Sequence, residues 1–512
     1  MLKKVYGSAV FGVEATTIVV EVNIDSGIGY HLVGLPDNAI KESNYRIAAA
    51  LQNNGYKIPG KKITINMAPA DLRKEGSAYD LTLAVGILSA SNQIQSEDLD
   101  KYLIMGELSL DGSLQPIKGA LPIAIKAREE GFKAFILPEQ NAKEAAIVND
   151  LEVLGASNIL EVIEHFDSNE QIAPTIVDTR EEFYKHLDFP EFDFSDVKGQ
   201  ESIKRCMEIA AAGGHNIILI GPPGSGKTML AKRLPSILPP MTLHEALETT
   251  KIHSVVGRVK EHTGLMTQRP FRSPHHTISD VALVGGGTYP QPGEISLAHN
   301  GVLFLDELPE FKRSVLEVMR QPLEDRDVTI SRAKFTVTYP SSFMLVASMN
   351  PSPGGYFNDP DAPVTSSPAE MQRYLSKISG PLLDRIDIHI EVTPVPFEKL
   401  AESRKGEASI EIRKRVTLAR DVQTERFKDL DTVHYNAQMS TKQIREYCQL
   451  DSASLELLKS AMERLNLSAR AYDRILKVAR TIADLDQSES IVGSHISEAI
   501  QYRSLDREGW LG

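Results

Sequence analysis

The octapeptide GPPGSGKT at positions 221–228 combines residue types at a spacing that is suited to chemistry. It matches the phosphate-binding pattern GxxxxGK[ST] at every fixed position. Its glycines let the backbone turn so that successive N–H groups converge on an anion. The sequence therefore predicts a nucleotide-phosphate site here rather than a plain glycine-rich turn. The expected ligands of the nucleotide are Gly221, Pro222, Pro223, Gly224, Ser225, Gly226, Lys227 and Thr228.

Two adjacent carboxylates, Asp306 and Glu307, directly follow the apolar run 302–305. Such a run predicts a buried strand, and open α/β folds bind ligands at the edge where their parallel strands end. An acidic pair after a strand is by itself often a solvated loop, but beside a phosphate loop we favour a catalytic site. Asp306 and Thr228 are then the expected metal ligands, for Mg²⁺. Glu307 is expected to orient or deprotonate the attacking water.

Other elements must hold these groups in place. The apolar run 216–220 predicts a strand before the loop, and 229–234 predicts the start of a helix after it. A third apolar run, 343–349, predicts a strand that ends at Asn350. The amide of Asn350 is suited to hold the attacking water against the γ-phosphate.

Arg385 and Arg470 are candidates for stabilising the transition state. Guanidinium groups match the charge on a transferring phosphate, whether they come from the same molecule or from a neighbour. The alternative for Arg385 is a structural ion pair with Asp384 or Asp387. The alternative for Arg470 is a solvated helix face.

Composition sets broad limits. A chain of 512 residues with 42% hydrophobic and 24% charged residues is ordinary for a globular protein of about three domains. A formal net charge of −13 argues against wholesale coating of nucleic acid and leaves room for a local basic channel. Cys206 and Cys448 cannot form a disulfide framework. With no signal peptide and no long apolar stretch, we expect a cytoplasmic protein that does not contact a membrane.

The pattern along the chain divides it into four parts. Residues 1–165 alternate strand-like and helix-like runs, and residues 166–194 read as a polar, acidic linker. Residues 195–395 contain the phosphate loop, and residues 396–512 have helical periodicity. In the first part, the expected strands are 16–24 and 61–67 and the expected helices are 38–54 and 79–90.

Long stretches of the sequence closely resemble the magnesium-chelatase-like AAA+ ATPases, specifically the ComM/YifB family. The resemblance covers essentially the whole chain. It implies an α/β multidomain fold with a Lon-protease-like N-terminal domain (ribosomal S5 domain 2-like), an AAA+ P-loop α/β core and a C-terminal helical lid. The stretches that carry it are 193–200, 221–228, 269–287, 293–311, 377–392 and 495–507.

The resemblance also implies roles for individual residues. ATP and Mg²⁺ are the implied cofactors. An arginine finger that acts in trans implies a ring-shaped homo-oligomer, a hexamer. The matching positions are Lys227 and Thr228 in Walker A, Asp306 and Glu307 in Walker B, Asn350 as sensor 1, Arg385 as the finger and Arg470 as sensor 2 on the lid.

The function implied by the family is a ring-forming ATPase that translocates DNA. It would be a branch-migration helicase acting on single-stranded or branched DNA during natural transformation, with recombination proteins as partners. Two alternatives stay open: a magnesium-chelatase-type motor, and a regulatory ATPase that remodels protein. We expect the N-terminal domain to argue against the first, because the chelatase motor does not resemble that region.

Two features depart from simple expectation. Many relatives carry cysteines just after the sensor 1 asparagine, but residues 350–356 read NPSPGGY, so no metal or thiol role is expected there. His275 and His276 could suggest metal ligands. Adjacent residues rarely face one site, and no cysteines lie near in the sequence, so we prefer a structural role for this pair.

The N-terminal region resembles a Lon protease domain that lacks its catalytic residues. In an ungapped alignment, Ala78 stands at the nucleophile position and Leu121 at the lysine position. Ser77 is one residue away from the first and Lys118 three from the second. A serine nucleophile needs a base within hydrogen-bond reach. We therefore expect a non-catalytic domain that serves assembly or a DNA channel. The alternative is a peptidase in which a different register pairs Ser77 with Lys118.

Residues 325–339 predict a hairpin with a basic tip. Two β-prone runs, 328–330 and 335–338, flank Arg332 and Lys334. In this clade the segment resembles a hairpin that faces the ring channel, so both side chains are candidate phosphate contacts. The alternative is an exposed tip with ordinary surface charges.

Overall fold

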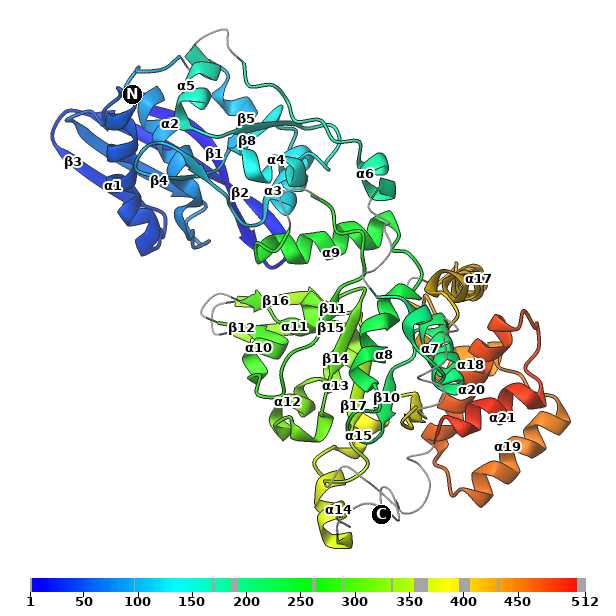
Figure 1. Ribbon diagram of the computed structural model, residues 1–512. Helices are drawn as coiled ribbons and strands as arrows, with labels where there is room; N and C mark the ends of the chain where they lie inside the picture. The colour runs from blue at the N-terminus through cyan, green and yellow to red at the C-terminus, as the bar shows by residue number, and fades with distance from the viewer. Residues whose placement is uncertain are drawn as a thin grey trace. The chain divides into compact units, whose positions relative to one another are not determined.

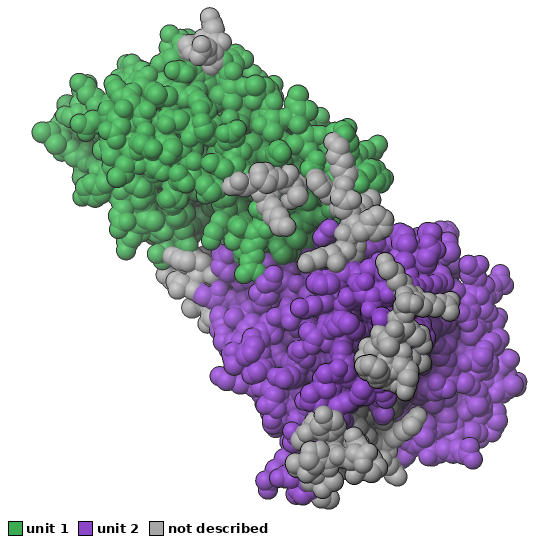
Figure 2. Space-filling model, viewed as in Figure 1, with its two compact units in different colours: residues 1–187, 242–267 green, residues 188–241, 268–512 purple. Residues whose placement is uncertain are grey.

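The computed structural model describes residues 2–95, 97–167, 171–185, 192–259, 264–287, 290–332, 335–353, 367–395, 406–430 and 432–503. The chain divides into two compact units, which Figure 2 shows in separate colours. Unit 1 comprises residues 1–187 and 242–267, and unit 2 comprises residues 188–241 and 268–512. Across the described ranges, no helix has the length and apolar character needed to cross a membrane.

Unit 1 is built on a seven-stranded mixed sheet with the order β3-β4-β2-β1-β5-β8-β9 (Figure 1). In β2, buried and less buried residues alternate, as expected for a strand with one face on the core. In β8 every residue is buried, which is typical of a strand covered on both faces. The strands are β1 (Leu2–Phe11), β2 (Glu14–Asp25), β3 (Gly29–Val33), β4 (Lys62–Ala68), β5 (Tyr102–Ile104), β8 (Ala134–Pro138) and β9 (Glu152–Ala156), with a small pair β6 (Glu107–Leu108) and β7 (Leu114–Gln115).

The helices of unit 1 pack on this sheet and on one another. Every residue of α2 is buried, and α2 packs on β1 and β2. Helix α6 lies inside the stretch expected to be a linker, and the hydroxyl of Thr179 at its start donates to the carbonyl of Ile147 at 2.9 Å. The helices are α1 (Asn38–Asn53), α2 (Asp80–Ala90), α3 (Ala120–Glu129), α4 (Glu139–Ala145), α5 (Ile159–Asp167) and α6 (Thr179–Lys185).

A further helix of unit 1 comes from the middle of the chain. Residues 242–267 leave unit 2 after the phosphate-loop helix, and their helix α9 (Leu243–Val255) packs against α3 (Figure 1). The buried carboxylate of Glu144 joins the two helices: it accepts from the Ser254 hydroxyl at 2.5 Å and from the Leu121 backbone N–H at 2.9 Å. Burial raises the pKa of Glu144.

Unit 2 contains a five-stranded, all-parallel sheet with the order β11-β14-β17-β10-β18. Every residue of β10, β14 and β17 is buried, which explains why the sequence shows unbroken apolar runs there. The strands are β10 (Ile217–Ile220), β11 (Phe271–Arg272), β14 (Val302–Leu305), β17 (Met344–Met349) and β18 (Ile388–Glu391). Two hairpins accompany them: β12 (Gly285–Gly286) with β13 (Gln291–Pro292), and β15 (Asp327–Arg332) with β16 (Phe335–Pro340).

One hydrophobic cluster joins the sheet of unit 2 to the C-terminal helices. It includes buried residues from Phe194 to Tyr502, and α7 packs against both α17 and α20. The helical C-terminal region therefore shares its core with the parallel sheet. The helices are α7 (Glu201–Gly213), α8 (Lys227–Arg233), α10 (Asp280–Val284), α11 (Glu294–Leu297), α12 (Arg313–Val318), α13 (Arg320–Asp325), α14 (Pro368–Leu375), α15 (Gly380–Leu383), α17 (Ser409–Arg426), α18 (Thr441–Tyr447), α19 (Ser452–Arg464), α20 (Ala469–Leu485) and α21 (Gly493–Gln501).

Candidate active site

The phosphate loop connects β10 to α8 with a backbone that glycine makes possible. Gly224 and Gly226 have φ values of +78° and +91°, in the region that disfavours other residues. At Gly221 a Cβ atom would lie 2.2 Å from the carbonyl oxygen of Val392, so the neighbouring strand excludes any side chain. The side chain of Gln200 supports the loop by donating to the Ser225 carbonyl at 3.0 Å.

Lys227 is buried and folds back over this loop. Its ammonium donates to the carbonyl oxygens of Gly221 at 2.6 Å and Pro222 at 3.0 Å, and to Oδ1 of Asn350 at 3.3 Å. Burial lowers the pKa of Lys227, while Asp306 and Glu307 act to raise it. The Lys227 ammonium is therefore surrounded by oxygen atoms at the loop where the nucleotide phosphates are expected to bind.

The acidic pair lies at the same edge. The Thr228 hydroxyl donates to Oδ2 of Asp306 at 2.7 Å, and the Ser348 hydroxyl donates to Oδ1 of the same carboxylate. The backbone N–H of Glu307 also contacts Asp306 Oδ1 at 3.1 Å and the Ser348 hydroxyl at 3.3 Å. Both carboxyl oxygens of Asp306 are thus oriented, and sequence reasoning did not identify Ser348 as the residue that orients one of them.

Strand order explains why Asn350 reaches Lys227. Strand β17 lies between β10, which leads into the phosphate loop, and β14, which leads into the acidic pair. All of these strands run in parallel, so Asn350, the residue after β17, comes out between the two motifs. The Tyr374 hydroxyl donates to the Asn350 carbonyl at 3.0 Å and holds its backbone. The structure brings Lys227, Thr228, Asp306 and Asn350 together, as expected for one site.

These residues fit a nucleotide and a Mg²⁺ ion. Gly224 and Gly226 give the loop its positive-φ turns, and Lys227 is held at the loop by the carbonyl groups of Gly221 and Pro222. A hydroxyl and a carboxylate at 2.7 Å are hard oxygen ligands of the kind Mg²⁺ prefers.

Arg385 and Arg470 lie away from this loop. They line one cavity of about 350 Å³ in unit 2. The same cavity is lined by Asn216, Phe343 and Asp387, which immediately precede β10, β17 and β18. In a parallel sheet this is the amino-terminal edge, opposite the edge where the phosphate loop lies. The structure therefore does not bring either arginine to the phosphate loop of its own chain.

Arg385 does not form the ion pair with Asp384 or Asp387 that was the alternative to a catalytic role. Its guanidinium bonds to Glu324 and to the Pro381 carbonyl, whereas Asp384 pairs with Arg470. The Nε of Arg385 is buried without a hydrogen-bond partner. Burial and nearby guanidinium groups, that of Arg470 among them, lower its pKa. The cavity thus combines arginines with the carboxylates Glu324, Asp384 and Asp387, and the Nε of Arg385 is the donor that they leave without a partner.

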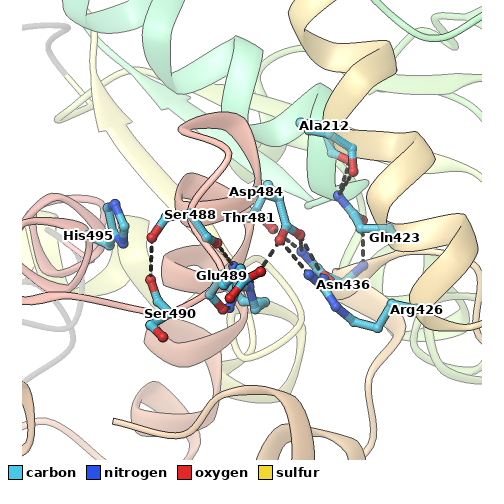
Figure 3. Close-up of polar contacts among 12 residues, drawn as sticks. Ala212, Gln423, Arg426, Asn436, Thr481, Asp484, Ser488, Glu489, Ser490 and His495 are labelled. Carbon is cyan, nitrogen blue, oxygen red and sulfur yellow. Dashed lines mark hydrogen bonds and ion pairs between the residues drawn. The ribbon is translucent and has the colours of Figure 1, made fainter. Parts of the chain in front are cut away.

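A buried polar network fixes the helix that begins next to Arg470. Asp484 near the end of α20 accepts from Arg426 at 2.5 Å and from Asn436 at 2.7 Å (Figure 3). It also accepts from Arg480 at 3.1 Å. Gln423, on the same helix as Arg426, donates to the Ala212 carbonyl of α7 at 3.1 Å (Figure 3). These bonds tie α20 to α17 and α17 to α7, so Arg470 stands on a rigid support.

The same network reaches the sheet. His215, before β10, contacts the hydroxyl of Thr481 at 2.8 Å and the carboxylate of Asp387 at 2.9 Å. Arg474 donates to Asp387 at 2.8 Å. Burial acts to raise the pKa of Asp387, but Arg474 and the hydrogen bond with His215 outweigh it and hold the pKa far below the ordinary range.

The predicted hairpin is present as β15 and β16, paired from Asp327–Pro340 to Arg332–Phe335. The hydroxyls of Thr329 and Thr338 lie 3.3 Å apart across it. Of the two expected DNA contacts, Arg332 ends β15 but its side chain is not described, and Lys334 lies outside the described residues.

The histidine pair lies at the acidic edge. Nδ1 of His276 is 3.5 Å from Oε2 of Glu307, and the His275 ring packs on the His276 ring. Within the described ranges, no group of three or more His, Cys, Asp or Glu residues is arranged to hold a metal. The sequence favours a structural role for the pair and gives no sign of the contact with Glu307.

In unit 1, Ser77 and Lys118 have different neighbours. The Ser77 hydroxyl donates to Glu107, and the side chain of Lys118 lies beside Gly257. Ala78, the expected nucleophile position, has no reactive group, and Leu121 is fully buried.

Comparison with known proteins agrees with the resemblance seen in the sequence. Models described as magnesium chelatase, subunit ChlI, match residues 193–400, 20–141 and, as its C-terminal part, 406–503. Competence protein ComM of Haemophilus influenzae is 44% identical over 98% of this chain and 97% of its own length. YifB of Escherichia coli, described as uncharacterized, is 44% identical over 99% of this chain and 98% of its own length. The chain belongs to the ComM/YifB family of magnesium-chelatase-like proteins.

A true chelatase subunit is a more distant relative. The magnesium-chelatase 67 kDa subunit of Heliobacterium mobile is 27% identical over 31% of this chain and 28% of its own length. The match of a ChlI model to residues 20–141 shows that the N-terminal region does not by itself argue against a chelatase, contrary to the expectation above. The extent of the match to ComM and YifB, however, is far greater.

Proposed function

We propose that this protein is a Mg²⁺-dependent ATP hydrolase. The observation that supports it best is the convergence of Lys227, Thr228, Asp306 and Asn350 at one edge of a parallel sheet, with Lys227 already 3.3 Å from Asn350. Open α/β sheets bind ligands at this edge. The same proposal assigns a Lon-like domain to residues 1–165, an AAA+ core to residues 195–395 and a helical lid to residues 396–512.

Each residue has a role in the proposed reaction. Lys227 leaves the loop carbonyls and binds the β- and γ-phosphates. Thr228 and Asp306 hold Mg²⁺, which neutralises phosphate charge when bound. Glu307 takes a proton from the attacking water, and the amide of Asn350 orients that water. Positioning and electrostatics carry most of the catalysis in phosphoryl transfer.

We also propose that the active form is a ring, a hexamer, in which Arg385 and Arg470 serve the neighbour's site. Both line a cavity at the amino-terminal edge of the sheet, whereas the phosphate loop is at the carboxyl-terminal edge. One subunit can therefore present its arginines while its neighbour presents a loop. The buried, unpartnered Nε of Arg385 supports an anion as the occupant.

DNA is the proposed substrate of the motor. The support is the relative named competence protein ComM, together with the hairpin β15–β16, between whose strands the sequence places the basic residues 332 and 334. We propose branch migration during natural transformation, with recombination proteins as partners. Unit 1 would be a non-catalytic, Lon-like domain, since Ser77 pairs with Glu107 rather than with a lysine.

The test is the steady-state ATPase rate with and without single-stranded and branched DNA, at two salt concentrations, beside Lys227→Ala. We expect DNA to stimulate hydrolysis, and stimulation to weaken with salt because counterion release drives phosphate contacts. Arg332→Ala with Lys334→Ala should reduce both the DNA affinity and its salt dependence. Hydrolysis that is indifferent to DNA would leave the ATPase intact and exclude DNA as its substrate.

A magnesium-chelatase-type motor is the second candidate, supported by the three ChlI-type matches. It predicts ATP hydrolysis without DNA stimulation and a requirement for a metal-inserting partner. The share of chain matched by a chelatase subunit, 31%, against 98% for ComM makes it the weaker proposal. Stimulation by unfolded protein, and not by DNA, would instead support protein remodelling.

A further inference from the structure

The histidine at position 276 has no part in the function proposed above, yet it contacts the residue expected to act as the base. We propose that His276 is a positioning residue that sets the orientation of the Glu307 carboxylate. This inference rests on the proposed ATPase function and adds to it the residue that orients the base, Glu307.

The backbone of Glu307 is fixed and its side chain is not. Its N–H is bonded to Asp306 and Ser348, and its φ of +54° lies in the left-handed region that non-glycine residues rarely occupy. Its side chain, in contrast, is 56% exposed. His276 contacts this carboxylate, with its Nδ1 3.5 Å from Oε2 of Glu307.

His276 is itself held on two sides. The His275 ring lies on one side, with centroids 4.1 Å apart and planes at 34°. Phe311 meets it edge-on, with centroids 6.4 Å apart and planes at 78°. Phe311 is buried and ends the turn Leu308–Glu310 that follows Glu307. One of the two rings that contact the imidazole, that of Phe311, therefore belongs to the same loop as the base.

Strand pairing explains why this contact can form. β11 pairs in parallel with β14, with Phe271 opposite Val302 and Arg272 opposite Leu303. The residues that follow each strand therefore emerge at one edge of the sheet. This brings His276, which follows β11, beside Glu307, which follows β14.

A glutamate that is half exposed samples many rotamers, and catalysis requires one of them. The nearby imidazole of His276 reduces the number of rotamers that the Glu307 side chain can adopt. It does so without contacting the phosphates, to which Lys227 and Thr228 are expected to bind. Loss of His276 should therefore slow the chemical step and leave nucleotide binding unchanged. Because a smaller folded fraction would also lower kcat at unchanged KM, kcat is expressed per nucleotide-binding site counted by titration.

The experiment measures kcat and KM for ATP in His276→Ala and His276→Asn, together with nucleotide affinity by fluorescence titration. Because polar contacts between partly exposed side chains are weak, we expect His276→Ala to lower kcat by about two- to fivefold at unchanged KM. His276→Asn keeps a nitrogen donor at the position of Nδ1 and should restore kcat. His244, exposed on α9 with its Nε2 3.6 Å from Glu248, gives a matched control, and His244→Ala should have no effect.

A double-mutant cycle separates this proposal from the one on which it rests. In a Glu307→Gln background, His276→Ala should cause no further loss, because the group it aims is gone. A kcat for His276→Ala that is unchanged or raised, or a further loss in that background, would overturn the positioning role alone. If the wild type hydrolysed ATP no faster than Lys227→Ala, the ATPase proposal would be overturned, and this inference with it.

Discussion

The ammonium nitrogen of Lys227 lies 3.3 Å from the side-chain oxygen of Asn350, although 123 positions separate the two residues. This contact joins the phosphate loop to the end of β17. It places the amide next to the cation that is expected to bind the terminal phosphate. The amide is therefore in position to act on whatever attacks that phosphate.

Replacement of Asn350 should affect chemistry more than binding. We expect Asn350→Ala to lower kcat by about 10²-fold, because a misplaced nucleophile loses that much rate. The affinity for ATP should change little, since Lys227, which is proposed to bind the phosphates, is retained in this variant. Rapid-quench measurement of hydrolysis, with a separate binding titration, checks both. Loss of affinity equal to that of Lys227→Ala would contradict the assignment.

The Thr228 and Asp306 pair should set the demand for Mg²⁺. Thr228→Val removes the hydroxyl that donates to Asp306 at 2.7 Å, whereas Thr228→Ser keeps it. We expect the Mg²⁺ concentration that gives half-maximal ATPase to rise by about tenfold or more in Thr228→Val. Thr228→Ser should stay close to the wild type. If both variants need the same Mg²⁺ as the wild type, the hydroxyl is not a ligand.

The opposite placement of the arginines and the phosphate loop predicts complementation between inactive subunits. Arg385→Ala and Lys227→Ala should each lower the ATPase rate, the first by about 10³-fold if it acts as an arginine finger. Mixed together, they should regain activity, because a Lys227→Ala subunit still offers Arg385 to its neighbour. The same should hold for Arg470→Ala.

A control for the mixing experiment is Arg445→Ala, an exposed arginine on α18, which should be active alone. The two inactive variants must first be shown to exchange subunits, by fluorescence energy transfer between labelled proteins. Exchange without any recovery of activity would contradict the proposed role of Arg385 at a neighbour's site.

The sequence predicted much of the site because its motifs sit at strand ends. The apolar runs 302–305 and 343–349 correspond closely to β14 and β17, and the hairpin was found at β15 and β16. Asn350 was identified for the same reason. Strand order, however, depends on pairing between residues far apart in the chain. The sequence alone therefore did not show that β17 lies between the other two motifs.

The contacts of His276 and Ser348 were not predicted for a related reason. Each acts through a side chain on a neighbouring strand or loop, and neither belongs to a motif with a fixed spacing. The position of residues 242–267 was also not foreseen. Its helix has ordinary periodicity, and nothing in a periodic pattern specifies which unit a helix packs against.

Asp484 should be essential for the stability of the C-terminal helices. Its carboxylate is fully buried and pairs with Arg426 and Arg480. Asp484→Ala would leave two guanidinium groups without their partner, and breaking a buried pair in this way costs about 3–5 kcal/mol. Urea unfolding followed by circular dichroism should show this loss. Asp429→Ala, an exposed aspartate in the same region, should unfold like the wild type.

Glu75 predicts a pH dependence of stability in unit 1. Burial, assisted by Asp37 and opposed by Arg73, raises its pKa from 4.5 to about 7. Between these values the folded state binds more protons than the unfolded state, so this group lowers stability as the pH rises through that range. Above pH 7 its full penalty is present.

Glu75→Gln removes that penalty. Its free energy of unfolding should exceed that of the wild type by about 1–3 kcal/mol at pH 8, after allowance for partial solvent screening, and match it near pH 4.5. Glu42→Gln, an exposed glutamate on α1, serves as the control and should show no pH-dependent difference. A gain in Glu75→Gln that is the same at both pH values would refute the mechanism.

The route of residues 242–267 limits how this protein can be divided. A fragment that starts after residue 187 still carries α9, whose buried side chains Ala246 and Ile252 would lose α3 as a packing partner. Such a fragment would expose apolar surface and tend to aggregate. A gene split at that point would likewise yield two pieces that must associate again, so the two units are expected to be inherited and expressed as one polypeptide.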